Sequence, residues 1–243
     1  DPPQQSARGA RSRRVSAKPR PIPTDWRYDQ MLQLPSIDTI YDRYQVPNNL
    51  RQHLYAVAAI GELISDHWSG PTLRRDQLRR VLLLHDIGNI VKMDEAEGEL
   101  AEIKRKTVEK YGSDDHVVSR AIAAELGFSN EDLDLMDQKV FVRNDETADG
   151  EDYTRKVGAY ADQRVAPDGV RPLMDRLLEA KERYRDKPGS SMNNHRTDML
   201  IRKAEEIEYQ LTVYCPLVPH GIMNEAIRPI AAELRVHKIV LGK

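Results

Sequence analysis

Cysteine is almost missing from this sequence: Cys215 is the only one in 243 residues. A lone thiol cannot close an internal disulfide, and no second cysteine stands near it to form a metal knuckle. Disulfide frameworks are typical of small secreted domains, whereas a chain of this length can bury a sizeable core without them. The cysteine content therefore favours a reducing, cytoplasmic setting.

Long apolar runs are missing as well, and the net charge is small. No stretch approaches the roughly 20 apolar residues that a membrane-spanning helix requires. The chain has 37 Lys and Arg residues against 39 Asp and Glu residues, for a formal net charge of -2. A nearly neutral protein has no general attraction to nucleic acid or to an anionic membrane. We expect neither as a partner, except where positive charge is concentrated locally.

Positive charge is concentrated in residues 1–25, which are rich in Arg, Ser, Pro and Gln. This composition lacks the aliphatic side chains that would offset the entropy of ordering, so the segment is predicted to be a disordered basic tail. Three interpretations of the tail stay open: a solvated extension, a nucleic-acid-binding arm, and a transit peptide that would direct the protein to an organelle.

Period-two alternation of β-branched residues is hard to find, whereas apolar residues recur every three or four positions after Trp26. That spacing places side chains on one face of an α-helix. The sequence therefore predicts an all-α fold in which residues 26–243 form a single helical domain. Pro and Gly clusters divide this domain into predicted helices. They cover about 27–44, 50–68, 72–86, 114–126, 131–145, 153–165, 170–185, 193–214 and 221–235.

Local signals mark three of these boundaries. Ser113 is a candidate N-cap for the helix over 114–126, and Gly127 is a candidate C-cap. The sequence Ala166-Pro167-Asp168-Gly169 is typical of a turn and ends the helix over 153–165.

A histidine lies on the apolar face of the second predicted helix. His53 is followed after four, seven and eleven positions by Val57, Ile60 and Ile64, and this spacing places all four side chains on one face. The imidazole is therefore predicted to point inward. A single inward histidine is more often bonded to a backbone carbonyl than to a metal, so His53 alone does not define a site.

The stretch LLLHDIGNIV, residues 82–91, ends an apolar helix with an imidazole next to a carboxylate. Gly88 is predicted to let the backbone turn away directly after His85 and Asp86. Asp162, within YADQRV, is also expected to face the interior. Carboxylates are costly to bury without partners, and two imidazoles with two carboxylates are a common donor set for a divalent transition metal.

The order H…HD…D resembles the ligand pattern of the HD-domain superfamily of metal-dependent phosphohydrolases. The segments that carry the resemblance are VPNNLRQHLYAVAAI, VLLLHDIGN and YADQRV, and it covers about residues 45–185. It implies an all-α bundle in which one divalent ion, from among Mn, Fe, Co, Ni, Zn and Mg, is held by His53, His85, Asp86 and Asp162. It also implies hydrolysis of a small phosphorylated substrate, a phosphomonoester or a nucleotide, by a metal-activated water that Asp86 orients or deprotonates.

Asn89 departs from the family pattern, because many members have Lys or Glu at this place. An amide can hydrogen-bond to phosphate or water, but it carries no charge and takes no proton at neutral pH. The nearest cationic substitutes are Lys92 and Arg164, for which the alternative is an ordinary solvated helix charge. His116 is a further candidate for contact with the substrate phosphate, the alternative being a position that only supports the start of its helix.

The substitution at Asn89 keeps a second class of function open, a non-catalytic protein that retains the fold and binds metal or a nucleotide. A third alternative is an HD-type oxygenase, which needs two irons and more ligands. His116 is the only histidine between Asp86 and Asp162, so a mononuclear site is favoured. The sequence contains neither a glycine-rich phosphate loop nor a nucleophile elbow that would indicate another enzyme class.

Overall fold

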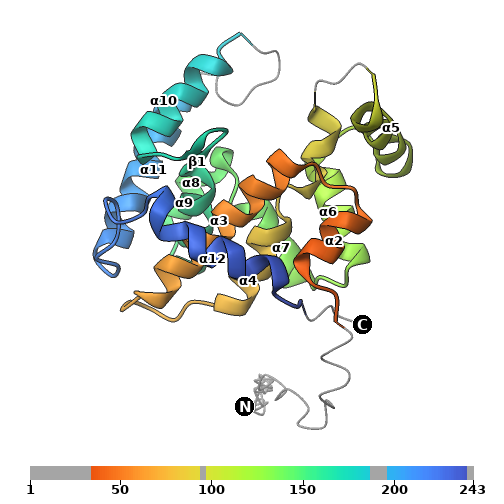
Figure 1. Cartoon of the computed structure of the whole chain (residues 1–243). Helices are drawn as coiled ribbons and strands as arrows, with labels where there is room; N and C mark the ends of the chain where they lie inside the picture. Colours follow the sequence, from red (N-terminus) through yellow and green to blue (C-terminus); the bar gives the residue numbers. More distant parts are fainter. Residues whose placement is uncertain (1–33, 94–96, 187–195, 240–243) are drawn as a thin grey trace, which may run out of the picture. The chain divides into compact units, whose positions relative to one another are not determined.

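A computed structural model of the chain describes residues 34–93, 97–186 and 196–239. The predicted basic tail over residues 1–25 lies outside these ranges, as does the beginning of the helix predicted from residue 27. From Leu34 onward the chain forms one compact unit. Its described part contains eleven α-helices, two 3-10 helices and one short hairpin, which confirms the predicted all-α fold (Figure 1).

The elements follow one another along the chain as α2 (Ile37–Arg43), α3 (Asn48–Asp66), α4 (Arg75–Leu84), η1 (Ile87–Lys92), α5 (Glu99–Tyr111), α6 (Asp115–Glu125), α7 (Asn130–Gln138), η2 (Phe141–Arg143), α8 (Asn144–Asp149), α9 (Tyr153–Gln163), β1 (Val165–Ala166), β2 (Gly169–Val170), α10 (Leu173–Arg183), α11 (Thr197–Thr212) and α12 (Asn224–Val236).

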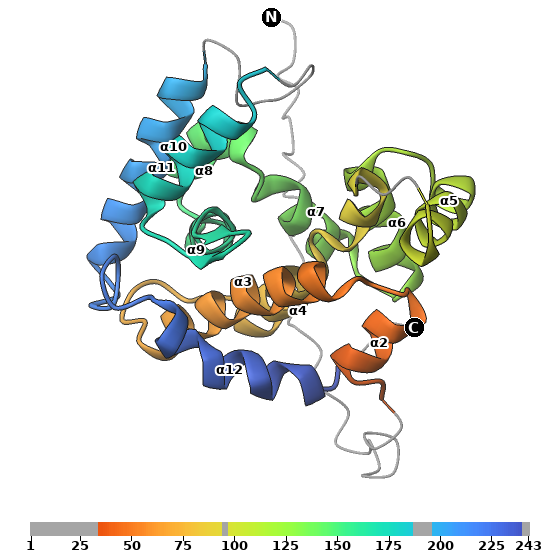
Figure 2. The same ribbon diagram turned by 45° about the horizontal axis from the view of Figure 1, so that its top comes forward.

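Helix α3 lies at the centre of this unit, with α4, α9 and α12 packed around it (Figure 2). Its apolar stripe is fully buried at Leu54, Val57 and Ile60. Burial of such side chains is the main favourable term in folding, at about 1.5–3 kcal/mol for each large aliphatic group. The helix is thereby fixed in the core, and it carries His53 on its length.

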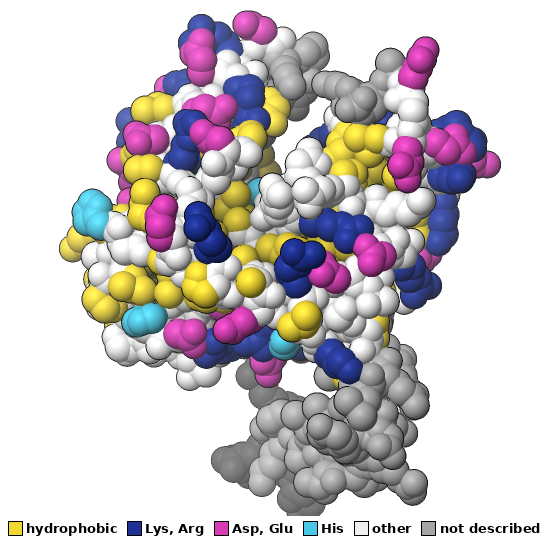
Figure 3. All heavy atoms as spheres, viewed as in Figure 1, with side chains coloured by type: hydrophobic (Ala, Val, Ile, Leu, Met, Phe, Trp, Pro, Cys, Tyr) yellow, Lys and Arg dark blue, Asp and Glu magenta, His cyan; other side chains and the backbone are white. Residues whose placement is uncertain are grey.

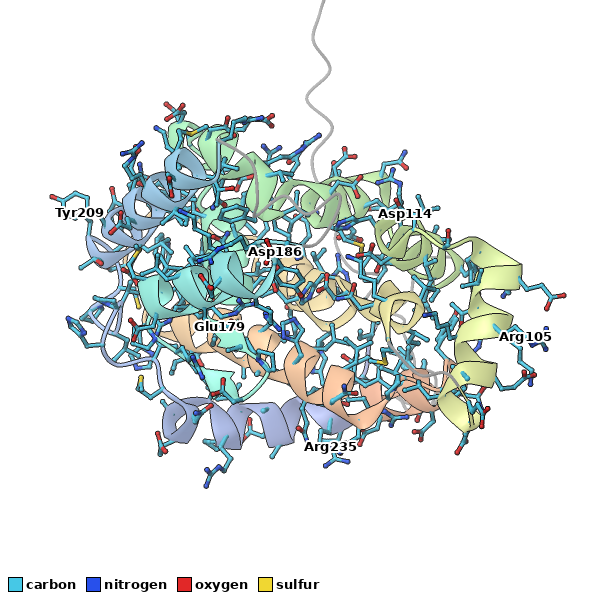
Figure 4. The ribbon with its side chains drawn as sticks, turned by 90° about the horizontal axis from the view of Figure 1, so that it is seen from above. Arg105, Asp114, Glu179, Asp186, Tyr209 and Arg235 are labelled. Atoms are coloured by element: carbon cyan, nitrogen blue, oxygen red, sulfur yellow. The ribbon has the colours of Figure 1, made fainter. Side chains whose placement is uncertain are left out.

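Two groups of helices flank this centre. Helices α8, α10 and α11 pack with α9, whereas α5 and α6 pack with η1 and α7 packs with α4. Helix α11 is amphipathic, because Leu200, Ala204, Ile207 and Leu211 are buried while Tyr209 points outward and is 73% exposed (Figure 4). Both η1 and α9, which are far apart in the sequence, contact the central helix α3.

The predicted caps and the predicted turn are present, but the N-cap lies one residue later than predicted. The N-cap of α6 is Asp114, whose carboxylate accepts a hydrogen bond from the Val117 N–H, and not Ser113. Gly127 has a left-handed φ of 82°, as expected of a C-cap glycine. The predicted turn at Pro167-Asp168 joins β1 and β2 in an antiparallel hairpin. Helix α5 was not predicted; none of its side chains is fully buried, and Ile103, Val108 and Tyr111 pack on the core while partly exposed.

Gly88 has a different role from the predicted one. The helix α4 already ends at Leu84, and the chain continues through Gly88 as the 3-10 helix η1. The φ of Gly88 is not positive, so no special backbone conformation requires glycine here. Instead, η1 lies directly against α6, and the Gly88 N–H donates a hydrogen bond of 2.9 Å to the Ser119 hydroxyl. Glycine is needed at position 88 because a side chain would not fit between η1 and α6.

Replacing Gly88 with alanine is therefore expected to destabilise the fold. A Cβ at this position would lie 2.3 Å from the Asp115 carbonyl oxygen and 2.6 Å from the Ser119 nitrogen, both backbone atoms. Overpacking of this kind lowers the free energy of unfolding by about 1–3 kcal/mol, which urea denaturation of the metal-free protein would measure. In the matched control, Gly150→Ala, the nearest atom would be at 3.1 Å, and a loss as large as that of Gly88→Ala would contradict the explanation.

Candidate metal centre

Three helical elements bring four potential metal donors together. His53 comes from the first half of α3, His85 and Asp86 come from the junction between α4 and η1, and Asp162 comes from the last turn of α9. One donor atom from each of these residues lies within 4.8 Å of all the others. Four ligands at about 2 Å from one ion span a similar distance, so only small side-chain movements separate this arrangement from a coordination sphere.

The two imidazoles face the two carboxylates. The His85 Nε2 atom is 3.3 Å from Asp162 Oδ1 and 3.7 Å from Asp86 Oδ1. The His53 Nε2 atom is 3.5 Å from Asp162 Oδ1 and 3.9 Å from Asp86 Oδ2. The two rings are tilted, with their centroids 5.5 Å apart. All four side chains thus converge on one point, although 77 residues separate His85 from Asp162 in the sequence.

The Nε2 atoms of both histidines belong to the donor cluster in which a cation would be held. The His85 Nδ1 atom is 2.7 Å from the Leu82 carbonyl oxygen, which can only accept, so Nδ1 carries a proton. In the neutral ring the lone pair is then on Nε2, the atom that lies 3.3 Å from Asp162 Oδ1. The His53 Nε2 atom is buried and has no hydrogen-bond partner among the described residues. An unpaired buried polar atom typically costs about 1–3 kcal/mol. A divalent ion would give this atom a partner, so the residues present fit such an ion.

Each carboxylate is held through one oxygen by a neighbouring donor. The Asn89 amide donates a hydrogen bond of 2.7 Å to Asp86 Oδ2. The Lys139 ammonium group is 3.0 Å from Asp162 Oδ2. Groups that orient metal ligands in this way are a regular part of metal sites. Asn89, which cannot replace the charge of Lys or the basicity of Glu, therefore has a structural role at Asp86.

Sequence reasoning missed Lys139. The residue is the C-cap of α7, and its side chain is only 3% exposed. It stands 23 residues before Asp162 and belongs to none of the motif segments. A lysine in an unremarkable helix end is normally a surface group, so no signal in a single sequence distinguishes it.

The pKa values of both carboxyl groups are lowered in this setting. Burial alone would raise the pKa of Asp162, but Lys139 and His85 outweigh it and hold that pKa well below the ordinary value. Burial likewise favours the neutral form of Asp86, and His85 and Lys139 again bring the pKa below its usual range. The centre consequently presents two negative charges at neutral pH, the state that a metal ligand requires.

Of the other predicted residues, Lys92 lies at the site and His116 does not. Lys92 lines the cleft above the cluster, with its ammonium group 2.6 Å from Asp115 Oδ2. The imidazole of His116 is 62% exposed, and its nearest acidic neighbour is also Asp115, at 3.8 Å. His116 is neither in the donor cluster nor among the residues that line the cleft.

Arg164 was predicted as a phosphate contact, and the structure contradicts this. Its side chain is fully buried, and residues two apart on a helix do not share a face, so it points away from Asp162. The guanidinium group donates hydrogen bonds to the Tyr160 hydroxyl and to the carbonyl oxygens of Arg171, Pro219 and Ile222. With these partners, Arg164 joins the end of α9 to the segment before α12.

A cleft of about 1300 Å³ opens above the donor cluster, lined in part by α3, η1, the β1–β2 hairpin, α10 and the start of α12. The space-filling view shows the surface notched between α10 and α5 (Figure 3). Cationic side chains in the lining are Lys92, Arg176, Arg183 and Arg228, and anionic ones are Asp86, Asp162, Asp168 and Glu225. Glu179, labelled on α10 in Figure 4, pairs with both Arg176 and Arg183.

An all-α bundle with two histidines and two aspartates at the foot of a cleft defines a class of helical metalloproteins. The HD domain family model matches residues 50–178, which is more than half of the chain. The protein belongs to the HD domain family, a superfamily of metal-dependent phosphohydrolases. No curated protein and no solved structure matches the chain. No helix among the described residues has the length and apolar character needed to cross a membrane.

Proposed function

We propose that this protein is a phosphohydrolase that uses one divalent metal ion to hydrolyse a phosphomonoester or a nucleotide. The observation that supports this most strongly is the convergence of His53, His85, Asp86 and Asp162, including the buried His53 Nε2 atom, which has no hydrogen-bond partner in the described part of the chain. When bound, a divalent ion would lower the pKa of a coordinated water and offset charge on the phosphoryl group.

The side chains of the cluster would hold the ion and activate the attacking water. The two imidazoles and the two carboxylates would hold the ion, and Asn89 keeps Asp86 oriented through its amide. Asp86 is the carboxylate that we propose to orient the attacking water or to take its proton. Because Asn89 cannot act as a base at neutral pH, this step depends on Asp86.

The charge of the cleft agrees with an anionic substrate. Four cationic and four anionic side chains line it, so a bound divalent ion would make the cleft more positive than the side chains alone make it. Lys92 from η1, Arg183 from α10 and Arg228 from α12 bring positive charge to the lining of the cleft from three different elements. Its volume exceeds the roughly 300–1000 Å³ of most small-molecule sites, which leaves space for a nucleotide as well as for a simpler phosphoester.

A substrate screen tests the proposal. Purified protein, stripped of metal and reloaded with Mn²⁺, Ni²⁺, Co²⁺, Zn²⁺, Fe²⁺ or Mg²⁺, is expected to release inorganic phosphate from at least one phosphomonoester or nucleotide. The variant Asp86→Asn removes both a proposed metal ligand and the proposed base, and it should lose at least about 100-fold in turnover, because a positioned base by itself typically contributes 10²–10⁴-fold.

The same screen decides the alternative that Asn89 keeps open, a non-catalytic metal- or nucleotide-binding regulatory protein. Bound metal without phosphate release from any compound would favour that alternative. A coupled diiron signal after loading with iron would instead favour an oxygenase, for which the described residues supply only these four clustered donors.

A further inference from the structure

Lys139 is a buried cation shared by both carboxylates of the metal centre. Its ammonium group is 3.0 Å from Asp162 Oδ2 and 4.0 Å from Asp86 Oδ1, and its side chain is 3% exposed. Buried charges need partners of opposite sign. The two aspartates are these partners, so Lys139 is part of the centre's own charge balance.

The two carboxylate oxygens of Asp162 have different contacts, because the Lys139 ammonium group is bonded to only one of them. Oδ2 is bonded to Lys139, whereas Oδ1 faces His53 at 3.5 Å and His85 at 3.3 Å. The two oxygens of Asp86 differ in a similar way, with Oδ2 bonded to the Asn89 amide and Oδ1 facing His85 at 3.7 Å. Each carboxylate thus has one oxygen occupied by a protein donor.

A second metal ion at Asp162 would have to compete with Lys139 for Oδ2. Centres with two ions about 3.5–4 Å apart are bridged and need additional carboxylates or histidines. Among the described residues, the only group of clustered donors is the one that contains these four residues. The exposed His116 lies outside it. A positive charge at Asp162 Oδ2 also repels any further cation that approaches the same oxygen.

We propose that Lys139 is a positioning residue that restricts the centre to a single divalent ion. It fixes Asp162 as a donor through Oδ1 alone and takes the place of a second cation between the carboxylates. This inference rests on the proposed metal site.

The test is a Mn²⁺ titration of the full chain, with the number of bound ions measured by equilibrium dialysis and the electronic coupling of the ions by electron paramagnetic resonance. The wild-type protein is expected to saturate at one ion per chain. Lys139→Met, which removes the charge but keeps an apolar stem, should bind a second ion at millimolar Mn²⁺ and show a coupled signal. Lys139→Arg restores the charge and should return to one ion.

Lys92→Met is the matched control. It removes a cation that lines the same cleft but is paired with Asp115, and it should still bind one ion. A ratio of one ion per chain in folded Lys139→Met would overturn the inference. Should that variant not fold, Lys139→Gln and the wild-type titration decide, because a second ion in the wild-type protein also overturns it. A wild-type chain that binds no ion would instead contradict the proposed function.

Discussion

Replacing His85 with alanine is expected to abolish the metal binding and, with it, the phosphohydrolase activity that we propose for this protein. His85 is 2% exposed, and its Nε2 atom is the nearest imidazole nitrogen to both carboxylates. Loss of a group that merely orients a metal ligand lowers affinity by about 10–100-fold, so loss of the ligand itself should exceed about 100-fold. Metal content after dialysis against Mn²⁺ or Zn²⁺ measures the first effect, and phosphate release measures the second.

Thermal unfolding gives an independent measure of the same loss. A ligand at 100 times its dissociation constant stabilises the folded state by about 2.7 kcal/mol, so added metal should raise the Tm of the wild-type protein and leave that of His85→Ala unchanged. His116→Ala is the matched control, since it removes an exposed histidine outside the cluster. If His85→Ala retains the metal content of His116→Ala, the assignment of His85 as a ligand is wrong.

Replacing Arg164 with methionine is expected to destabilise the protein strongly. The buried guanidinium group is bonded to four protein oxygens, and methionine would leave three carbonyl groups without that donor. Hydrogen bonds to charged groups contribute about 1.5–3 kcal/mol each, in a non-additive way. We therefore expect a loss of about 3–5 kcal/mol in the free energy of unfolding, measured by chemical denaturation of the metal-free protein.

Arg228→Met provides the comparison, because Arg228 is an exposed arginine on α12. Its substitution should change the free energy of unfolding by no more than about 0.5 kcal/mol. If Arg164 were a phosphate contact instead, its substitution would raise KM and leave stability close to that of Arg228→Met.

The sequence alone was sufficient for the fold class and for the four clustered residues. Helical periodicity determines which face of a helix is buried, so the inward direction of His53 followed from its spacing to Val57 and Ile60. The pair His85-Asp86 at the end of an apolar helix was readable for the same reason. Order along the chain then connected these residues with Asp162 and with the family that the comparison showed.

The contacts around those four residues were decided only by the tertiary structure. Arg164 is close to Asp162 in sequence but lies on another face of the helix, and its partners come from segments far along the chain. Lys139 reaches Asp162 because α7 and α9 pack against each other, and Gly88 is needed because η1 lies against α6. Periodicity determines the side of a helix that is buried, but the partner across the interface depends on how distant elements pack, which no local pattern encodes.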